Sequence, residues 1–371
     1  ANGGKTEGLG RDIFAEDPYW IEKDLARLKE RQASQITVSG SNRAGYGLVS
    51  VEFPPRDTGQ AIWMYYGLNS VAAHKCALMF GYEAFGVSVC PPLGYRELWG
   101  GWPKSVEWED NTISHNTVVV NGERQSVIPV GDPLFFGQFE EVGGFSVDAP
   151  SAYGGITDIY RRTMASVQVG DHSSYAVDVF HVRGGEDHLM SYHAVPGSVE
   201  TEGLSLSRQE EGSYAGPDVP YGTSMKGPRM GYSWLKDVDR DSDPPEVFSL
   251  DVEGEPPFPN LEKNDDLHVR YHSFTDYSDV ALATGIPPGE TPPEIRYFLG
   301  HRSQEGDKEL TSSFVSIVET YLSKPSIKQA TRLKVAGDVG GLEAVALRVE
   351  RVDGAVDYVM ISPDDTTEWE V

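Results

Sequence analysis

The fold is decided by residues 72–125, which read AAHKCALMFGYEAFGVSVCPPLGYRELWGGWPKSVEWEDNTISHNTVVVNGERQ. An apolar run follows His74 and ends at a Gly-Tyr pair, residues 94–95, after which comes a tryptophan-rich loop. A polar Ser-His-Asn-Thr group, residues 114–117, then opens a second apolar run at 118–120. Short apolar runs bounded by Gly, Pro and polar turns are typical of β-strands. We therefore expect two histidines on neighbouring strands with aromatic residues between them, which indicates a carbohydrate or metal site.

The chain beyond residue 44 continues in the same way. Short β-type runs separated by Gly, Pro, Asp and Asn are typical of a large antiparallel sandwich, and the 24 prolines and 40 glycines suit its loops. The predicted fold class is therefore mainly β, a large antiparallel β-sandwich. We expect strands at 46–53, 61–66, 79–89, 116–121, 134–139, 144–148, 156–169, 174–182, 188–194, 246–252, 267–274, 279–284, 295–299, 313–320, 330–335, 341–350 and 355–361.

Residues 15–34 carry the one clear helical pattern. Glu16, Asp17 and Pro18 supply a start signal, and apolar residues then recur at helical spacing as far as Leu28. Little else in the chain would cover this apolar face. We therefore expect a helical segment that packs against another helical body.

Residues 199–262 are the least regular part of the sequence and read as an insertion or a long loop. The run Asp-Val-Asp-Arg-Asp-Ser-Asp-Pro-Pro at 237–245 imitates the Asp-x-Asp spacing of a calcium loop. It lacks the central Gly and the terminal Glu that such a loop needs. A solvated loop is the favoured interpretation of this run, and calcium is the alternative.

Composition excludes some functions. A net charge of −26 argues against nucleic acid as a partner, but a few arginines focused in a cleft can still attract an anionic polysaccharide. The plain alternative is an acidic surface that serves solubility. No apolar run reaches the ~18–20 residues of a membrane span, so we expect no membrane partner. Cys76 and Cys90 can form one bridge or lie as two small buried side chains.

The block 72–125 resembles heparinase II/III-like polysaccharide lyases. The family pattern has a His-x-His-x-Asp strand, an Asp-Pro-Gly-Tyr turn, then His-Asn-Thr-Val-Val-Val and a Gln, which here match His74, residues 94–95, residues 115–120 and Gln125. The resemblance runs from about residue 40 to the end. Further matching pieces are Tyr-Arg-Arg at 160–162, the Gly-Gly, His and Tyr-His of 184–193, and the closing strands at 314–319 and 357–365.

The resemblance implies a domain plan. Residues 1–40 would be the end of an (α/α) toroid, and residues 41–310 a heparinase II/III-like β-sandwich with the insertion at 199–262. Residues 311–371 would be its closing strands or a small C-terminal β-subdomain. We expect the chain to be a fragment or one product of a cleaved precursor, secreted or periplasmic, with the helical toroid on a second chain. The sequence leaves its oligomeric state open.

The family degrades uronate-containing polysaccharides by β-elimination, and this chain departs from its pattern. Ungapped counting places His74 on the second His of His-x-His, so the catalytic first His is Ala72. The following Asp is Cys76, and the Asp of Asp-Pro-Gly-Tyr falls on Pro92. These losses indicate altered chemistry or none. Tyr and His suit proton transfer near neutral pH, and the candidate catalytic residues are His74, Tyr95, His115 and His193.

Zinc is the one candidate cofactor, and no organic cofactor is expected. In related lyases the second His, the Asp and the His of His-Asn-Thr bind a structural zinc, which here retains His74 and His115. Cys90 lies two residues before Pro92, so on an extended strand it would face the same side and complete a His₂Cys site. The alternative is a pair of hydrogen-bonded core histidines. His188 and His193 should lie on opposite faces of one strand.

The loop between the two histidines is the expected substrate contact. Trp99, Trp102 and Trp108 can stack on sugar rings or pack against the helical domain, and Arg96 and Lys104 are the candidates for a uronate carboxylate. We expect the loop to form a cleft wall in which its glutamates stay wet, because burying an unpaired carboxylate is costly.

Three functions follow from these observations. The first is a lyase part that acts on an acidic poly- or oligosaccharide. The second is a glycoside hydrolase variant on the same fold, because Ala72 removes an elimination residue. The third is a non-catalytic carbohydrate-binding or scaffold protein.

Overall fold

The computed structural model describes residues 39–40, 47–53, 59–67, 74–94, 102–126, 131–170, 173–258, 261–262, 265–289, 293–304, 309–335, 338–339 and 342–363. All of these belong to one compact unit, Val38–Val371. The expected helix at 15–34, and with it the helical segment expected at 1–40, lies outside the described residues except for Ser39 and Gly40.

The described chain is mainly β with very little helix, which confirms the predicted fold class. Its first sheet is antiparallel and follows chain order, β1-β2-β3-β4-β5. The run expected as one strand at 79–89 is a hairpin, since Phe85 and Gly86 both have positive φ, 56° and 71°. The strands are β1 (Ser39–Gly40), β2 (Leu48–Phe53), β3 (Gln60–Tyr65), β4 (Met79–Ala84) and β5 (Val87–Cys90).

The largest sheet of the described chain has the order β12-β15-β16-β19-β10-β9-β8-β7. Its central strands are long, and they are buried almost throughout because both faces of the sheet are covered. Its strands are β7 (Asp132–Gln138), β8 (Val142–Asp148), β9 (Ile159–Gly170), β10 (Ser173–Arg183), β12 (Gly197–Glu202), β15 (Val247–Gly254), β16 (Leu267–Phe274) and β19 (Thr311–Leu322).

A second sheet carries the histidine motifs and has the order β13-β14-β17-β18-β11-β6 in the described chain. Its strands are β6 (Val118–Val120), β11 (Asp187–His193), β13 (Ser207–Arg208), β14 (Leu235–Asp241), β17 (Asp279–Gly285) and β18 (Ile295–Ser303).

The remaining elements are small. One further sheet has the order β20-β23-β24 and another pairs β21 with β22. Of the expected closing strands at 311–371, β19 lies inside the largest sheet, whereas the later ones form these small sheets. The elements are β20 (Ile327–Leu333), β21 (Asp338–Val339), β22 (Leu342–Glu343), β23 (Val345–Arg351), β24 (Val356–Ile361), the π-helix η3 (Ser105–Glu109), and the 3₁₀ turns η4 (Thr112–Ser114), η5 (Pro150–Tyr153) and η6 (Tyr232–Trp234).

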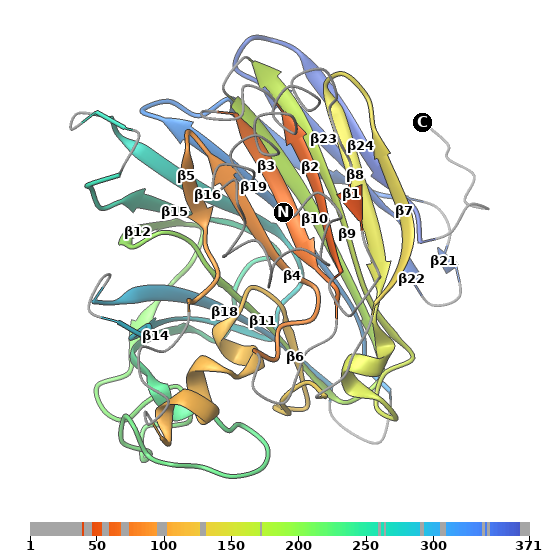
Figure 1. The fold of residues 1–371 in the computed structure, drawn as a ribbon. Helices are drawn as coiled ribbons and strands as arrows, with labels where there is room; N and C mark the ends of the chain where they lie inside the picture. Colours follow the sequence, from red (N-terminus) through yellow and green to blue (C-terminus); the bar gives the residue numbers. More distant parts are fainter. Residues whose placement is uncertain are drawn as a thin grey trace, which may run out of the picture. The chain divides into compact units, whose positions relative to one another are not determined.

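Three apolar clusters hold these sheets in layers (Figure 1). One face of the largest sheet packs against both the β1–β5 sheet and the β6-containing sheet, through residues such as Met164 and Phe180. Its other face packs against β23 and β24, through residues such as Val177 and Ile317. The outer face of the β6-containing sheet is covered by η3 and the loops around Tyr214 and Tyr232. The residues of β6 alternate between the two faces of its sheet. Val118 and Val120 pack toward the largest sheet, and Val119 packs under η3 and the loops on the outer face.

The segment 199–262, expected as an irregular insertion, contains regular strands. Most of β12 and all of β14 and β15 lie in it, together with a longer irregular stretch between β13 and η6. The acidic run expected as a solvated loop begins inside β14, where Val238 is buried and Asp239 forms an ion pair with Arg296. The sequence hides this strand because its register shifts between Lys236 and Asp239, which breaks the alternation of apolar and polar residues.

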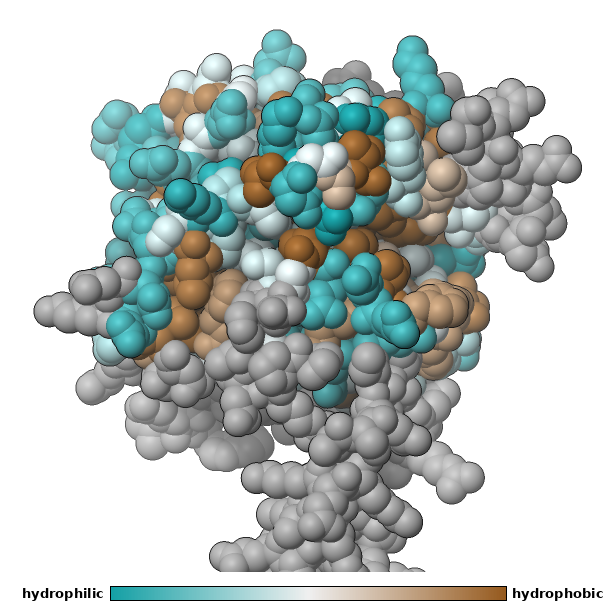
Figure 2. Space-filling model, turned by 90° about the horizontal axis from the view of Figure 1, so that it is seen from above, coloured by the Kyte–Doolittle hydropathy of each residue, from teal (hydrophilic) through white to brown (hydrophobic). Residues whose placement is uncertain are grey.

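Between its grey parts, the face seen in Figure 2 shows hydrophobic residues in separate groups among hydrophilic ones. Exposed hydrophobic side chains also gather on β7, β8 and β24, which together with β9 line an apolar groove of about 620 Å³. Among the described residues, no helix is both long and apolar enough to cross a membrane.

Candidate functional site

Three buried imidazoles from separate segments come together beneath η3 and η4. His74 comes before β4, His115 follows η4, and His193 ends β11. The ring centroids of His74 and His115 lie 4.8 Å apart, so the expected approach of these two histidines is confirmed. Their exposed fractions are 8% and 0%, and that of His193 is 1%. We call these three residues the histidine cluster.

The residues that follow His115 hold the cluster together. The Asn116 side chain accepts a hydrogen bond from the His193 N–H at 2.8 Å and donates one to the His193 carbonyl at 3.1 Å. This exchange imitates a β-ladder pair and continues the β6–β11 pairing past the end of β6. The Thr117 hydroxyl donates to the Ala77 carbonyl at 2.9 Å, which fixes the segment that carries His74. The His-Asn-Thr motif therefore positions all three imidazoles.

Gln125 fixes the same segment from a second direction. Its Oε1 accepts from the Ala77 N–H at 2.6 Å, and its Nε2 donates to the Ala77 carbonyl at 3.1 Å and to the Tyr160 hydroxyl at 2.9 Å. Tyr160 in turn donates to the Val118 carbonyl at 2.6 Å. The motif glutamine thus acts on the backbone next to His74 and not on a ligand.

Arg162 of the Tyr-Arg-Arg strand forms the base of this arrangement. Its side chain is 1% exposed and makes a two-pronged ion pair with Asp178, at 2.8 Å from Nε and 2.6 Å from Nη2. Its Nη1 donates to the carbonyls of Leu78 and Asn116 at 2.8 and 2.6 Å. A buried charge is tolerated only when it is paired and hydrogen-bonded, as this one is. Arg162 therefore joins β9 and β10 to the two segments that carry His74 and His115.

The electrostatics of the cluster keep the imidazoles of His115 and His193 neutral. Burial, and next the nearby His74 and His193, hold the pKa of His115 well below its usual value, and burial lowers the pKa of His193 to about 3. Both ring nitrogens of His115 and of His193 have no hydrogen-bond partner among the described residues. Buried polar atoms without partners are uncommon and call for an explanation, such as a bound water or ion.

Asp110 is a neighbour of the cluster that the sequence motifs do not indicate. Its Oδ1 lies 3.8 Å from His74 Nε2, and its carbonyl accepts from the Lys75 N–H at 2.9 Å. Only the backward turn of η3 and η4 brings it there, and no local sequence signal reports this contact.

Cys90 is not grouped with the two histidines expected to share a metal with it. Its Sγ lies 3.4 Å from the Tyr192 hydroxyl, inside the apolar cluster between the sheets. Burial raises the pKa of the thiol to about 12, which disfavours the thiolate that zinc binds. Within the described ranges, no three or more His, Cys, Asp or Glu side chains are arranged to hold a metal ion. No chemical step is therefore assigned to zinc.

The two cysteines are free thiols in this structure, so of the two alternatives for Cys76 and Cys90 it contains the pair of small buried side chains.

His188 and His193 lie on opposite faces of β11, as their spacing predicts. His188 faces the largest sheet, where its Nδ1 lies 2.8 Å from the Ser312 hydroxyl. His193 faces the other way, with its ring 4.8 Å from that of Tyr297. His188 therefore has a packing role, and His193 is the one that reaches the cluster.

The tryptophan loop divides into an exposed and a buried part. Trp102 is 66% exposed, whereas Trp108 is fully buried against Tyr297. Lys104, expected to meet a carboxylate of the substrate, lies 3.5 Å from Glu109. Tyr95, Arg96 and Trp99, together with Ala72, lie outside the described residues.

The expectation that the glutamates of this loop stay wet is wrong for Glu107 and Glu109, which are 2% and 6% exposed. Glu107 is satisfied by the Ser224 hydroxyl, the Met225 N–H and the Trp234 indole. These hydrogen bonds from a distant loop offset the free-energy cost of burying the Glu107 carboxylate, which was the reason to expect it in solvent.

Comparisons with known proteins support the fold. No protein-family model matches the chain, and no curated protein sequence resembles it closely enough to count as a relative. The structure of the heparan sulfate lyase of Pedobacter heparinus superposes with a TM-score of 0.53 at 10% identity, covering 93% of this chain and 48% of the lyase. A heparinase III structure gives a TM-score of 0.53 at 12% identity and covers 87% of this chain and 41% of that one.

Identities this low show the fold alone. The chain therefore has a fold related to that of polysaccharide lyases, and it spans less than half the length of these solved structures.

Proposed function

We propose that this chain is the β-sandwich part of a carbohydrate-active enzyme that degrades an acidic, uronate-containing poly- or oligosaccharide by β-elimination. A helical toroid, supplied by another chain, would form the other side of the cleft. The protein would be secreted or periplasmic, where such polysaccharides are met. The observation that carries the proposal is the pairing of His74 with His115, on a fold shared with heparan sulfate lyase.

The proposed reaction requires only a few catalytic groups from the site. β-Elimination needs a base for the proton on C5, an acid for the leaving oxygen and a positive partner for the enolate. Of the cluster, His74 is the most exposed, and it is therefore the best placed to meet a substrate. His115 and His193 would act as positioning residues, because neither reaches the surface. Tyr95 stays a candidate acid or base, and Arg96 and Lys104 stay candidates for the carboxylate.

The test is digestion of uronate-containing polysaccharides by the protein together with its helical partner. A lyase product absorbs in the unsaturated-uronate band, so absorbance should rise in step with the new reducing ends. New reducing ends without that absorbance would replace the lyase by a hydrolase. The variant His74→Ala should abolish the rise, whereas His188→Ala, on the far face of β11, serves as the matched control for loss of a buried imidazole.

A second function, carbohydrate binding without catalysis, is favoured by the burial of the cluster. Two of its three imidazoles are at most 1% exposed, and the family's catalytic position is Ala72. Binding of an oligosaccharide with no product of either kind would establish this alternative.

Zinc at His74 and His115 also stays a proposal, and among the described residues no third side chain is grouped with them as a ligand. The unpartnered nitrogens of His115 are what a metal or a water would satisfy. We expect the purified chain to hold close to one zinc and the variant His115→Ala to hold none. A metal content near zero in both proteins would leave the cluster as three core histidines without a metal.

A further inference from the structure

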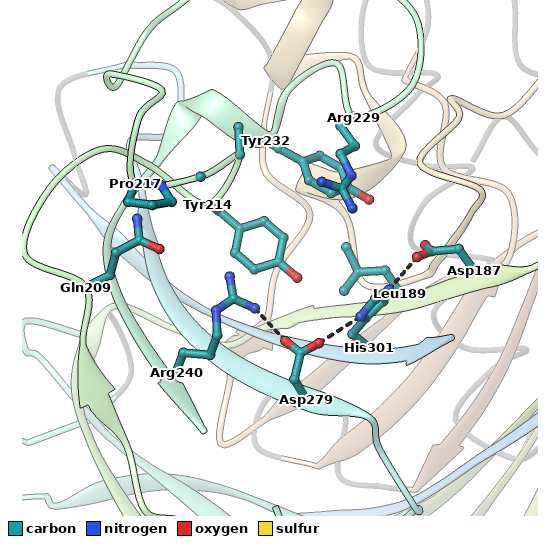
Figure 3. A pocket seen from close by; sticks show the side chains of 12 residues that line it. Asp187, Leu189, Gln209, Tyr214, Pro217, Arg229, Tyr232, Arg240, Asp279 and His301 are labelled. Atoms are coloured by element: carbon teal, nitrogen blue, oxygen red, sulfur yellow. Dashed lines mark hydrogen bonds and ion pairs between the residues drawn. The ribbon is translucent and has the colours of Figure 1, made fainter. Parts of the chain in front are cut away.

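A second pocket lies on the outer face of the β6-containing sheet, away from the histidine cluster. It measures about 260 Å³ and is lined by charged and aromatic side chains from several strands and two loops (Figure 3). Leu189 and Asp187 of β11, Arg240 of β14, Asp279 of β17 and His301 of β18 form its floor. Small-molecule sites typically combine a concave shape with a few convergent polar groups, and this pocket has both.

The floor is a fixed chain of charges. His301 lies between two carboxylates, with its Nδ1 2.8 Å from Asp279 Oδ2 and its Nε2 on Asp187. Asp279 also forms an ion pair with Arg240. Burial opposes a charge on His301, but the hydrogen bonds to Asp187 and Asp279 outweigh it and raise its pKa to about 9. The protonated His301 and the Arg240 guanidinium therefore face two carboxylates, so the charges of the four groups balance.

Arg229 adds a positive charge that the pocket does not balance. It makes no ion pair with any residue in the described ranges, and its side chain is exposed at the mouth of the pocket. Its backbone is held at a positive φ of 65°, and its N–H donates to the Gly122 carbonyl at 2.8 Å. Non-glycine residues in this conformation cost energy and cluster at functional sites. Arg229 and Arg240 approach the pocket from opposite sides (Figure 3).

Two tyrosines form the aromatic wall. The rings of Tyr214 and Tyr232 lie 5.3 Å apart, and the Arg240 guanidinium lies 5.1 Å from the centre of the Tyr214 ring. Aromatic faces suit the apolar face of a sugar ring, and the free lone pairs of paired carboxylates can still accept hydroxyl hydrogen bonds. The surplus of one positive charge, in a chain of net charge −26, favours a ligand with one negative charge.

We propose that this pocket binds one small sugar acid, a hexuronate, with Arg229 on its carboxylate and the tyrosine wall on its ring. The preference for an anion rests on the pocket charges alone, whereas the choice of a sugar acid among small carboxylates rests on the proposed function. The site would hold a chain end or a released unit at a distance from the cleavage site.

The experiment is a titration of the chain with glucuronate in which binding is measured by saturation-transfer NMR. Glucose, which is neutral and has the same ring size, is the comparison ligand. Glucuronate should bind, and glucose should bind at least about tenfold more weakly, because a charge-assisted hydrogen bond is lost. The variant Arg229→Gln should weaken glucuronate binding about tenfold. Arg348→Gln, on β23, is the matched control and should leave it unchanged.

Three outcomes would overturn the proposal: no binding of glucuronate, equal binding of glucose, or unchanged binding by Arg229→Gln at an unchanged melting temperature. Because Arg229 is exposed and Gln keeps the same backbone requirement, loss of folding is not expected to obscure the result. Binding is measured here without turnover, so a failure to find lyase product would leave this result standing. Formation of lyase product without glucuronate binding would overturn the proposal for the pocket and leave the proposed function standing.

Discussion

Arg162 shows how one side chain can connect several motifs of this sequence. It is the second arginine of the Tyr-Arg-Arg motif, its guanidinium lies 4.5 Å from the centre of the Phe80 ring, and it pairs with Asp178. The motif residues Asn116 and Leu78 meet it through their backbone carbonyls. Its role is therefore to hold the site in place from below.

We expect Asp178→Asn to lower the free energy of unfolding by about 3–5 kcal/mol, because it leaves the Arg162 charge buried without its partner. Urea unfolding of both proteins measures the loss. Asp158→Asn is the control, since its pair with Arg183 is 56% exposed on the Asp side and such surface pairs contribute about 1 kcal/mol or less. Equal losses of unfolding free energy in the two variants would show that the buried pair stabilises the fold no more than the surface pair does.

The segment formed by η3 and the residues just before it contains one tryptophan that faces solvent and one that is buried in the core. Trp102 and Trp108 lie six positions apart, yet one is 66% exposed and the other fully buried. The buried one packs edge-on against Tyr297, with ring centroids 5.3 Å apart.

Trp102→Ala should therefore weaken oligosaccharide binding by roughly 2–10-fold, the loss of one aromatic contact, and leave the melting temperature nearly unchanged. Trp108→Ala should cost about 3–5 kcal/mol of stability, as other large-to-small core changes do. Binding assays and thermal unfolding on the two variants check this. Stability lost in Trp102→Ala with binding intact would assign Trp102 to packing as well.

The strands show how far the sequence predicts this fold. Alternation and Gly or Pro boundaries placed most strands within a few residues, for example β16 at 267–274 and β24 near 355–361. β12 was missed because it is a polar edge strand with every second residue exposed. β14 was missed because Asp237, at a φ of 50°, lies in an irregularity that shifts the register.

The candidate site was predictable only where its residues follow local motifs. His74 and His115 lie on matched motif positions, and their predicted approach is confirmed. The prediction that they lie on neighbouring strands is wrong, because neither residue lies in a strand and the strands that follow them, β4 and β6, belong to different sheets. Asp110 reaches His74 through the turn of η3 and η4, and Glu107 finds its partners in a loop more than a hundred residues away. Such contacts depend on tertiary packing, which no local pattern records.

Taken together, the buried histidines should govern how the protein responds to acid. Burial lowers the pKa of His193 to about 3 and those of His181 and His188 to about 4. An unfolded histidine has a pKa of about 6.5, so between these values the unfolded chain binds more protons than the folded one. The free energy of unfolding therefore falls as pH falls, by about 1.4 kcal/mol per pH unit for each such histidine.

His301 has the opposite sign, because its folded pKa of about 9 lies above the unfolded value. Its contribution is complete below about pH 6.5 and is lost as pH rises through about 9. Urea unfolding at a series of pH values should show the free energy of unfolding falling on both sides, an acid limb toward low pH and an alkaline limb as pH rises through about 9. His193→Phe, which loses no hydrogen bond of the ring, should flatten the acid limb; an acid limb of unchanged slope would mean that His193 is charged in the folded protein.

The buried Arg162 pair also has a consequence for the order in which the protein folds. The two carbonyls that Arg162 meets lie 84 and 46 residues away in the chain, so closing these contacts requires long loops. The guanidinium can leave water only when β9, β10 and the segments carrying His74 and His115 have met, which places this step late. Asp178→Asn should therefore speed unfolding far more than it slows folding, and the pair would serve mainly to lengthen the lifetime of the native state.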